Sequence, residues 1–241
     1  ELKQAEPGLR DAGLGGLHWL GPWTVSDRGG LVEAYAGLFE RLGGTIVRGD
    51  AASLSERNGI WSVTSRDGRI DAEAAVVALG PWSPDVLRKF GYNIPMVRKR
   101  GYHRHYAGGS ALELPLRDVA CGYVVAPMQK GLRITTGAEL AMPDDKPMPV
   151  QLARAEQAAR EIIDLGRPVE VEPWFGTRPC MPDMLPVLGP APWHKGLWMH
   201  FGHGHQGFTL GPVTGRILAE LMSGETPSAD VLPYRPDRFM T

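Results

Sequence analysis

The sequence predicts an α/β protein, and three observations lead to this fold class. The nearly all-apolar run Leu197–Phe201 is typical of a strand buried on both faces, and a glycine-rich loop and a helix follow it. The dipeptides Asn58-Gly59 and Asp67-Gly68 are strong hairpin signals that separate three short strands. Residues 150–166 form an amphipathic helical pattern between further strand-like segments.

Composition limits the class of protein further. The 241 residues are 43% hydrophobic and 22% charged, with a net charge of −1, as in a globular chain of one or two domains. This balance gives no general attraction to nucleic acid or to an anionic membrane. Cys121 and Cys180 have neither metal-ligand nor disulfide spacing, which favours a reducing cytoplasm. No run of 18 apolar residues occurs, so we expect no transmembrane segment.

The first long helix is expected to follow residue 27. Ser26 or Asp27 provides its N-cap, and Gly43-Gly44 ends it. Its apolar positions recur at intervals of four, three and four residues, at Leu31, Tyr35, Leu38 and Leu42. A strand is expected to begin at Thr45–Val47, and residues 74–79 are expected to form a buried strand that ends in the sharp turn Gly80-Pro81-Trp82.

The character of the chain changes at about residue 84. Residues 97–107 are basic and interleaved with aromatic side chains. We expect an edge strand there and not a nucleic-acid patch, because the rest of the chain is nearly neutral. A hairpin over residues 123–136, the helix at 150–166 and a strand at 169–177 are expected to follow.

The loop after Leu197–Phe201 matches the letters of the dinucleotide fingerprint GxGxxG at residues 202–207. The fingerprint requires a βαβ unit of roughly 30 residues, with a second strand that ends in an acidic residue about 20 positions on. No apolar strand leads to Asp230, so this interpretation fails. Pro212 is expected to open the helix, whose apolar stripe comprises Val213, Ile217, Leu218, Leu221 and Met222.

The same stretch resembles the C-terminal flavin-contacting segment of the D-amino acid oxidase and glycine oxidase family, which includes D-amino acid dehydrogenases and sarcosine oxidases. That segment consists of a strand, Gly-His-x-x-x-Gly and then Pro-x-Thr-Gly at the start of a helix. The matching residues are Gly202, His203, Gly207, Pro212, Thr214 and Gly215. The resemblance implies FAD as cofactor, with the loop against the isoalloxazine ring. It implies these cofactor-binding residues: Ala52, Gly80, Trp82, Gly202, His203, Gly204, His205, Gln206, Gly207, Phe208 and Thr209.

A second motif supports the resemblance. Residues 176–183, followed by Pro186 and Gly189, are similar to the family pattern GxRPxxxD…PxxG. The resemblance implies that Arg178 binds the substrate carboxylate, a task that suits a permanently charged, bidentate guanidinium. From the residues alone, the favoured interpretation of Arg178 is a structural arginine paired with a nearby acid.

The resemblance also implies the domain organisation. Residues 1–27 form an entry segment, 28–83 and 180–241 belong to the FAD-binding domain, and 84–179 form an interleaved, mixed-sheet α+β substrate-binding domain. The dinucleotide-binding βαβ unit that precedes this region in the family has no counterpart here. We therefore expect a fragment with an incomplete FAD-binding domain, which self-associates or requires the missing segment.

Four residues have two interpretations each. His200, His203 and His205 form HxxHxH, which suggests a metal-dependent hydrolase, although a strand end and a glycine loop do not make the three side chains converge. His205 stands where glycine oxidase has a second arginine, so it either donates a hydrogen bond to substrate or fills space. Tyr123 either lies near the substrate carboxylate, as the resemblance implies, or is a core tyrosine.

The function expected from the resemblance is FAD-dependent oxidation of the C–N bond of an amino acid or related amine, by hydride transfer to flavin N5. Oxygen or a quinone is the expected electron acceptor, and no side chain is expected to act as a catalytic acid or base, because the cofactor supplies the chemistry. The alternative is a catalytically silent module or subunit. We expect no metal and no nucleic-acid partner, and a cytoplasmic location with peripheral membrane association as the alternative.

Overall fold

The computed structural model describes residues 2–10, 15–142 and 145–240, and the chain folds into two compact units. Unit 1 comprises Glu1–Gly44 and Arg100–Gly176, and unit 2 comprises Thr45–Lys99 and Thr177–Thr241. Residues 1 and 11–14 of the expected entry segment lie outside the described residues.

These boundaries differ from the expected ones at residues 28, 84 and 180. The helix after residue 27 belongs to unit 1, where the N–H of Gln129 donates to the carbonyl of Ser26. Residues 84–99 belong to unit 2, because Leu87 and Tyr92 are buried in its core.

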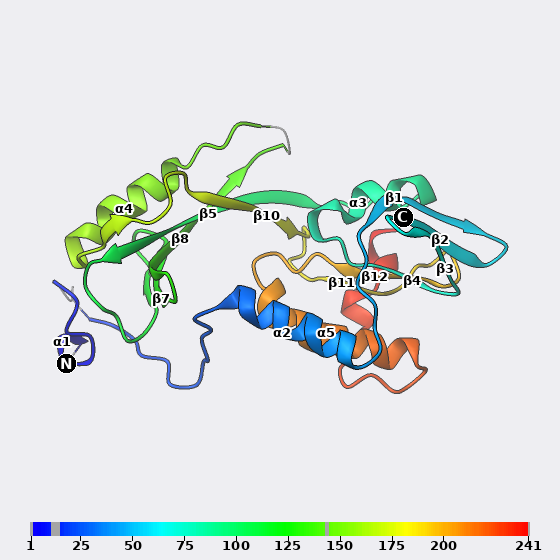
Figure 1. The fold of residues 1–241 in the computed structure, drawn as a ribbon, viewed down its shortest axis with the longest axis horizontal. Coiled ribbons are helices and arrows are strands. Elements are labelled where there is room, and N and C mark those ends of the chain that lie inside the picture. The colour runs from blue at the N-terminus through cyan, green and yellow to red at the C-terminus, as the bar shows by residue number, and fades with distance from the viewer. Residues whose placement is uncertain (1, 11–14, 143–144, 241) are drawn as a thin grey trace. The chain divides into compact units, whose positions relative to one another are not determined.

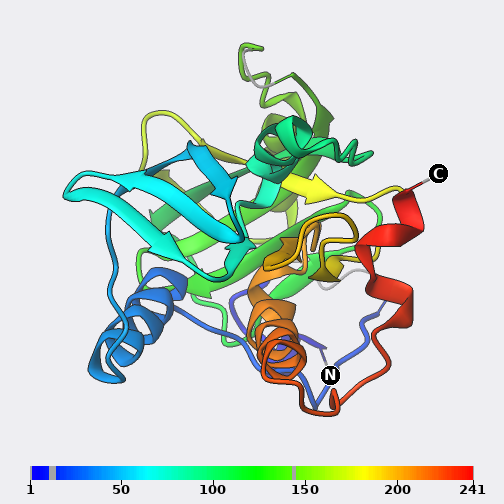
Figure 2. The ribbon, with the colours of Figure 1, turned by 90° about the vertical axis from the view of Figure 1, so that its right-hand side faces the viewer.

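Unit 2 contains two small sheets (Figure 2). Strands β1 (Gly49–Arg57), β2 (Ile60–Ser65) and β3 (Gly68–Ala72) form an antiparallel meander, drawn in blue to cyan. Asn58 and Gly59 both have positive φ, +55° and +81°, which confirms the hairpin predicted from this dipeptide. The second sheet has the order β11 (Val187–Pro190), β12 (Leu197–Phe201), β4 (Ala75–Val77), with β12 parallel to β4 and antiparallel to β11.

Two expected strands of unit 2 are shorter than predicted. The strand expected from Thr45 begins at Gly49, and the one expected over residues 74–79 is limited to Ala75–Val77. Val77 is buried, but Val76 is 41% exposed, because β4 is the last strand in its sheet. Helix α3 (Ser83–Leu87) and the 3₁₀ turns η1 (Gly80–Trp82), η2 (Arg88–Phe90), η3 (Leu232–Tyr234) and η4 (Pro236–Phe239) complete the unit, together with α5 (Gly207–Met222).

Unit 1 is built on a six-stranded sheet with one covering helix (Figure 1). The strand order is β10-β5-β8-β7-β6, and β9 pairs with β5. The strands are β5 (Val97–Gly108), β6 (Leu116–Asp118), β7 (Tyr123–Met128), β8 (Gly131–Leu140), β9 (Gly166–Pro168) and β10 (Trp174–Cys180). Helix α4 (Val150–Ile162) buries Leu152, Ala155 and Ala159 against this sheet. It ends before the predicted residue 166, because Ile163 is extended and completely buried.

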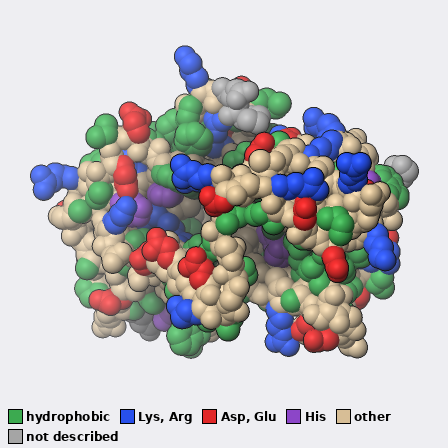
Figure 3. Space-filling model, turned by 45° about the vertical axis from the view of Figure 1, so that its right-hand side comes forward, with side chains coloured by type: hydrophobic (Ala, Val, Ile, Leu, Met, Phe, Trp, Pro, Cys, Tyr) green, Lys and Arg blue, Asp and Glu red, His purple; other side chains and the backbone are tan. Residues whose placement is uncertain are grey.

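The basic strand β5 is internal to the sheet, which contradicts the expected edge strand. Three of its basic side chains lie beside acids of unit 1. Arg100 lies 3.4 Å from Glu139, Arg104 lies 3.3 Å from Glu156, and His105 lies 2.7 Å from Glu170. On the face shown in Figure 3, basic and acidic side chains are interspersed.

Helix α2 (Arg28–Arg41) has a confirmed N-cap but an uncovered apolar stripe. Asp27 accepts a 3.0 Å hydrogen bond from the N–H of Gly30, as predicted. None of the helix residues is buried, and Leu31 and Tyr35 are 37% and 53% exposed. The remaining helix is the short α1 (Leu2–Ala5), and in the part of the chain that the structure describes no helix is long and apolar enough to cross a membrane.

Arg238 connects the C-terminal segment to the turn between β10 and β11. Its guanidinium donates to Asp183 Oδ2 at 2.8 Å and to the carbonyls of Leu185, Pro186, Tyr234 and Arg235. Burial alone raises the pKa of the Asp183 carboxyl, but the hydrogen bonds from Arg238 and from the N–H of Leu185 lower it below its ordinary value. Met184 in this turn has φ +63°, a conformation that a non-glycine residue rarely adopts.

We expect Arg238→Ala to lower the free energy of unfolding of unit 2 by about 2 kcal/mol, because charged hydrogen bonds to half-buried acceptors are lost. Arg235→Ala is the control, since the Arg235 side chain is 49% exposed and pairs with Asp237 on the surface. Its effect should stay below about 1 kcal/mol in urea unfolding.

The same pair predicts a pH dependence. Because the folded pKa of Asp183 is depressed, its stabilising contribution is present above the unfolded pKa and is lost as pH falls through the folded value. The difference between wild type and Arg238→Ala should therefore shrink between pH 7 and about pH 3. Equal losses for both arginine variants, or a difference independent of pH, would contradict this role.

Candidate functional site

The carboxyl ends of β4 and β12 define one edge of unit 2. The two strands run parallel, with Met199 opposite Val77, so the turns that follow them lie at the same edge. The turn after β4 is η1, where the N–H of Leu79 donates to Ser83 Oγ at 3.1 Å. The loop after β12 comprises residues 202–206. Ligands of open sheets with parallel strands bind outside this type of edge.

The loop after β12 depends on glycine at two positions. Gly202 and Gly204 have φ of +86° and +57°. A Cβ on Gly202 would lie only 2.7 Å from Met181 Cγ. The N–H of Gly204 donates to the carbonyl of Pro179 at 2.8 Å, and His203 pairs with Cys180. The loop is therefore fixed to the end of β10.

Arg178 lies two residues before Cys180 on β10 and is half-buried. Alternate residues of a strand share a face, so Arg178 lies on the same face as Cys180. The Cys180 Sγ atom lies 3.7 Å from the position that a Cβ on Gly204 would take. The structure thus brings the predicted carboxylate-binding residue and the predicted cofactor loop together within unit 2.

Helix α5 begins directly after this loop, five residues before the predicted start. It runs from Gly207, so Pro212 lies inside the helix and does not open it. A proline disfavours a helical conformation of the residue before it, mainly by a clash with the Cβ of that residue. Here that residue is Gly211, which has no Cβ. Gln206 at the N-cap makes no side-chain cap hydrogen bond, so the first N–H groups and the positive dipole end are presented at the edge described above.

The buried face of α5 also differs from the prediction. Thr214, Ile217 and Leu218 are buried, whereas Val213 and Met222 of the expected stripe are 48% and 39% exposed. The inward face includes a polar residue, Thr214, which contacts His200 of β12. Sequence patterning assigns a threonine to the polar face, so the sequence identifies Thr214 as a motif residue without a structural role.

His200 and His203 converge on Thr214. Their Nε2 atoms lie 2.8 and 3.0 Å from Thr214 Oγ1, and the two ring centroids are 4.9 Å apart. Burial lowers the pKa of His203 to about 4, with a smaller contribution from His200, and burial also lowers the pKa of His200. Both rings are therefore neutral near pH 7.

His205 does not join them. It is exposed, and its Nε2 atom lies 3.2 Å from the side-chain amide of Gln206. Across residues 2–10, 15–142 and 145–240, no three His, Cys, Asp or Glu side chains are grouped so that they could hold a metal ion. The HxxHxH pattern thus does not form a three-histidine site, and the hydrolase hypothesis is not favoured.

The other residues predicted to bind the cofactor lie in separate places in unit 2. Gly80 has φ +53° and Trp82 is 66% exposed, both in the turn after β4. The backbone of Ala52 is occupied by Asp50, which accepts from its N–H, and by Lys89, which donates to its carbonyl. The loop residues Gln206, Gly207, Phe208 and Thr209 are exposed.

Tyr123 belongs to unit 1 and is 1% exposed in the core beneath α4. Burial raises the pKa of its hydroxyl, with a further contribution from Asp118. Its burial matches the core-tyrosine interpretation and argues against contact with a substrate.

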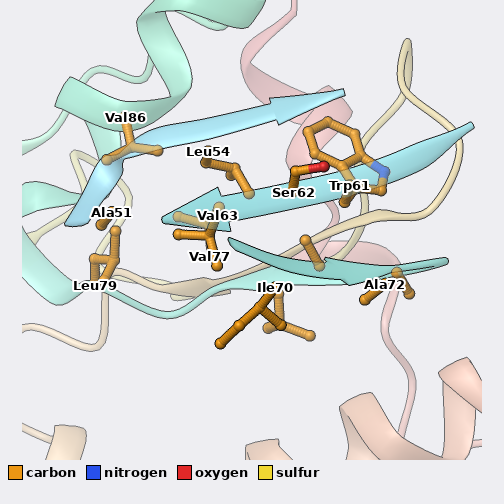
Figure 4. A pocket seen from close by; sticks show the side chains of 13 residues that line it. Ala51, Leu54, Trp61, Ser62, Val63, Ile70, Ala72, Val77, Leu79 and Val86 are labelled. Carbon is orange, nitrogen blue, oxygen red and sulfur yellow. The ribbon is translucent and has the colours of Figure 1, made fainter. Parts of the chain in front are cut away.

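An apolar groove of about 270 Å³ lies between the meander and β4 (Figure 4). Leu54, Val63 and Ile70 line it, with Val77 and Val86. Ser62 is its polar lining residue, and the Ser62 hydroxyl donates to Asp71 at 2.7 Å. The groove offers no charged group for a polar ligand. It is an apolar surface next to the site rather than the site itself.

Comparison with known proteins agrees with the fold and identifies the family. Residues 1–221 match the family model described as FAD dependent oxidoreductase. The chain is 32% identical over 251 residues to a D-amino-acid oxidase of Bradyrhizobium diazoefficiens, covering 100% of this chain and 58% of that protein. A D-amino acid dehydrogenase of Sinorhizobium medicae is 32% identical over 249 residues, covering 98% and 58%.

Solved structures of this type have a similar fold. The crystal structure of glycine oxidase from Geobacillus kaustophilus superimposes with a TM-score of 0.65 at 21% identity, over 80% of this chain and 52% of that one. Fold and strand-edge site define a flavin-type α/β domain with an interleaved second sheet. The chain belongs to the FAD-dependent oxidoreductase family. It spans somewhat more than half the length of the relatives named above.

The residues present fit one part of FAD. Two glycines with positive φ and an uncapped helix start suit close approach of a flat, electron-rich ring. The phosphates and ribose require a strand, a glycine turn and a helix followed by an acidic residue. Within the described ranges, glycine turns follow both β4 and β12, and the 202–206 loop after β12 is already engaged by Cys180 and Pro179.

The loop geometry gives a stability prediction. Gly202→Ala combines a positive φ with a contact to Met181, so it should lower the free energy of unfolding by about 2 kcal/mol. Gly215→Ala is the matched control, because a Cβ there has no heavy atom within 4 Å inside helix α5. It should raise stability by about 0.5–1 kcal/mol. Similar effects of the two substitutions in chemical unfolding would show that the loop conformation is not constrained.

Proposed function

We propose that this chain provides the flavin-ring loop and the substrate-carboxylate anchor of an enzyme that oxidises the C–N bond of an amino acid. The observation that supports this most directly is the attachment of the Arg178 strand to the 202–206 loop. Gly204 donates to Pro179, and His203 pairs with Cys180. A carboxylate anchor and a cofactor loop must be adjacent if the substrate Cα–H is to lie within hydride reach.

Each part has a separate task in this proposal. Arg178 holds the substrate carboxylate through two parallel N–H donors and so fixes the direction of the Cα–H bond. Gly202 and Gly204 allow the backbone to approach a planar ring closely. The start of α5 stabilises negative charge at the ring edge. FAD, when bound, accepts the hydride.

The site is also electrostatically suited to a deprotonated amine. The buried imidazoles of His200 and His203 are neutral near pH 7, so they add no positive charge that would compete with Arg178 for the carboxylate. His205, at the position of the second arginine in glycine oxidase, is exposed, and its Nε2 atom lies 3.2 Å from the side-chain amide of Gln206. We therefore infer a single charged anchor for the substrate.

The two units correspond to two tasks in the proposal. Unit 2, with β4, β12 and α5, is the cofactor-facing part, and unit 1, with its large sheet, is the substrate-binding part. The matched relatives include an oxidase and a dehydrogenase. Activity with oxygen alone, compared with activity that requires a quinone or a dye, separates these two electron acceptors.

Arg178→Ala tests the anchor in the FAD-loaded enzyme. We expect KM for glycine and D-alanine to rise about 10- to 100-fold, because a charged pair of hydrogen bonds to the carboxylate is lost. We expect kcat to change less. Arg178→Lys should recover part of the affinity, because it restores the charge without the fork.

Arg216→Ala is the control for this test, since that side chain is 71% exposed on α5 and pairs with Glu220. It should leave KM unchanged. Oxidation of carboxylate substrates by Arg178→Ala with wild-type KM would refute the assigned role.

The 241-residue chain by itself should bind FAD weakly, with a dissociation constant above about 1 μM. The described residues provide contacts for the ring, and these contacts alone must offset the ordering of a large, flexible cofactor. Titration followed by flavin fluorescence measures this affinity. Submicromolar binding of one flavin per chain would show that the described residues suffice, whereas no binding at all would favour a catalytically silent module.

A further inference from the structure

Four hydrogen-bonding groups meet at one hydroxyl in unit 2. Thr214 Oγ1 lies 2.8 Å from the carbonyl oxygen of Leu210, 3.3 Å from that of Gly211, 2.8 Å from His200 Nε2 and 3.0 Å from His203 Nε2. The partners come from helix α5, strand β12 and the loop that follows this strand. Thr214 itself is 9% exposed, so water does not easily replace any of them.

The donor inventory of these groups favours one arrangement. A threonine hydroxyl has one proton and accepts two hydrogen bonds, and a carbonyl oxygen can only accept. The Thr214 proton therefore goes to Leu210, where the distance is short and the i−4 geometry is the usual one for threonine in a helix. Both histidines must then donate, each through a protonated Nε2.

We infer that Thr214 is a positioning residue that holds His200 and His203 as neutral Nε2–H tautomers and thereby fixes the 202–206 loop to α5. Each Nδ1 atom retains its lone pair as an acceptor. One oxygen atom connects the strand, the loop and the helix. Loss of this oxygen releases two rings at once and leaves two half-buried N–H groups without an acceptor.

The charge state of the rings is consistent with this arrangement. The two imidazoles face each other, and the burial that lowers their pKa values also excludes water from the shared hydroxyl. The start of α5 adds a positive dipole, which further disfavours a cation in the loop. The inference is independent of the proposed function, because it concerns the chain without a cofactor.

Nitrogen-15 NMR of histidine-labelled protein at pH 7 tests the tautomers directly. Nδ1 and Nε2 shifts distinguish Nε2–H, Nδ1–H and charged rings, and His200→Gln and His203→Gln variants assign the signals. We expect both rings to be neutral with the proton on Nε2. An Nδ1–H tautomer or a cation at either position would overturn the inference without any Thr214 variant.

Substitutions test the effect on the loop. Thr214→Ser keeps the hydroxyl and should retain both Nε2–H signatures. Thr214→Val should change the tautomer populations and accelerate hydrogen exchange of the Gly204 and Gln206 amides at least tenfold, because these amides donate within the loop and to Pro179. A rate change of this kind reports local opening of the loop rather than global unfolding.

Thr136→Val is the matched control. Thr136 is also 9% exposed, and its hydroxyl donates to the carbonyl of Gly122 in unit 1, with no histidine partner. It should leave the His200 and His203 signals and the loop exchange rates unchanged. Wild-type tautomers and wild-type exchange in Thr214→Val would overturn the positioning role, whatever the affinity for FAD proves to be.

Discussion

The parallel pairing of β12 with β4 is the constraint on which the site depends. It places the carboxyl ends of both strands, and hence two glycine turns, at one edge of unit 2. The antiparallel partner β11 then returns the chain so that the end of β10 reaches the same edge. Arg178 is positioned by this topology, because its strand ends where the loop after β12 begins. A ligand at this edge meets backbone, a helix start and a guanidinium together.

Polar groups of this unit are held by side chains that lie far from them in sequence. Thr214 satisfies two histidines from β12 and its loop, and Arg238 satisfies Asp183 and two carbonyls of the following turn. Such residues contact no ligand in the proposed function. They determine whether the loop and the motif turn keep one conformation, which is a requirement for precise substrate placement.

Some apolar surfaces of the chain remain uncovered. The stripe of α2 is exposed, Val76 on the outer strand β4 is 41% exposed, and an apolar groove lies beside it. Leu197, Met199 and Phe201 of β12, in contrast, are almost completely buried. Large exposed apolar patches mark interaction surfaces. The chain spans 58% of the length of its D-amino-acid oxidase relative.

Features that depend on local chemistry can be predicted from the sequence alone, because φ preferences and donor geometry act within a few residues. They are the Asn58-Gly59 hairpin, the Asp27 cap and the order of strand, glycine loop and helix around Gly202. The motif at Arg178 likewise indicated the family. Tertiary structure decided whatever depends on partners distant in sequence. It made β5 an internal strand, because acids from other elements lie beside three of its basic side chains, and it rotated α5 so that Thr214 faces inward. Burial of a polar residue is decided by the groups that satisfy it, and no local pattern contains them.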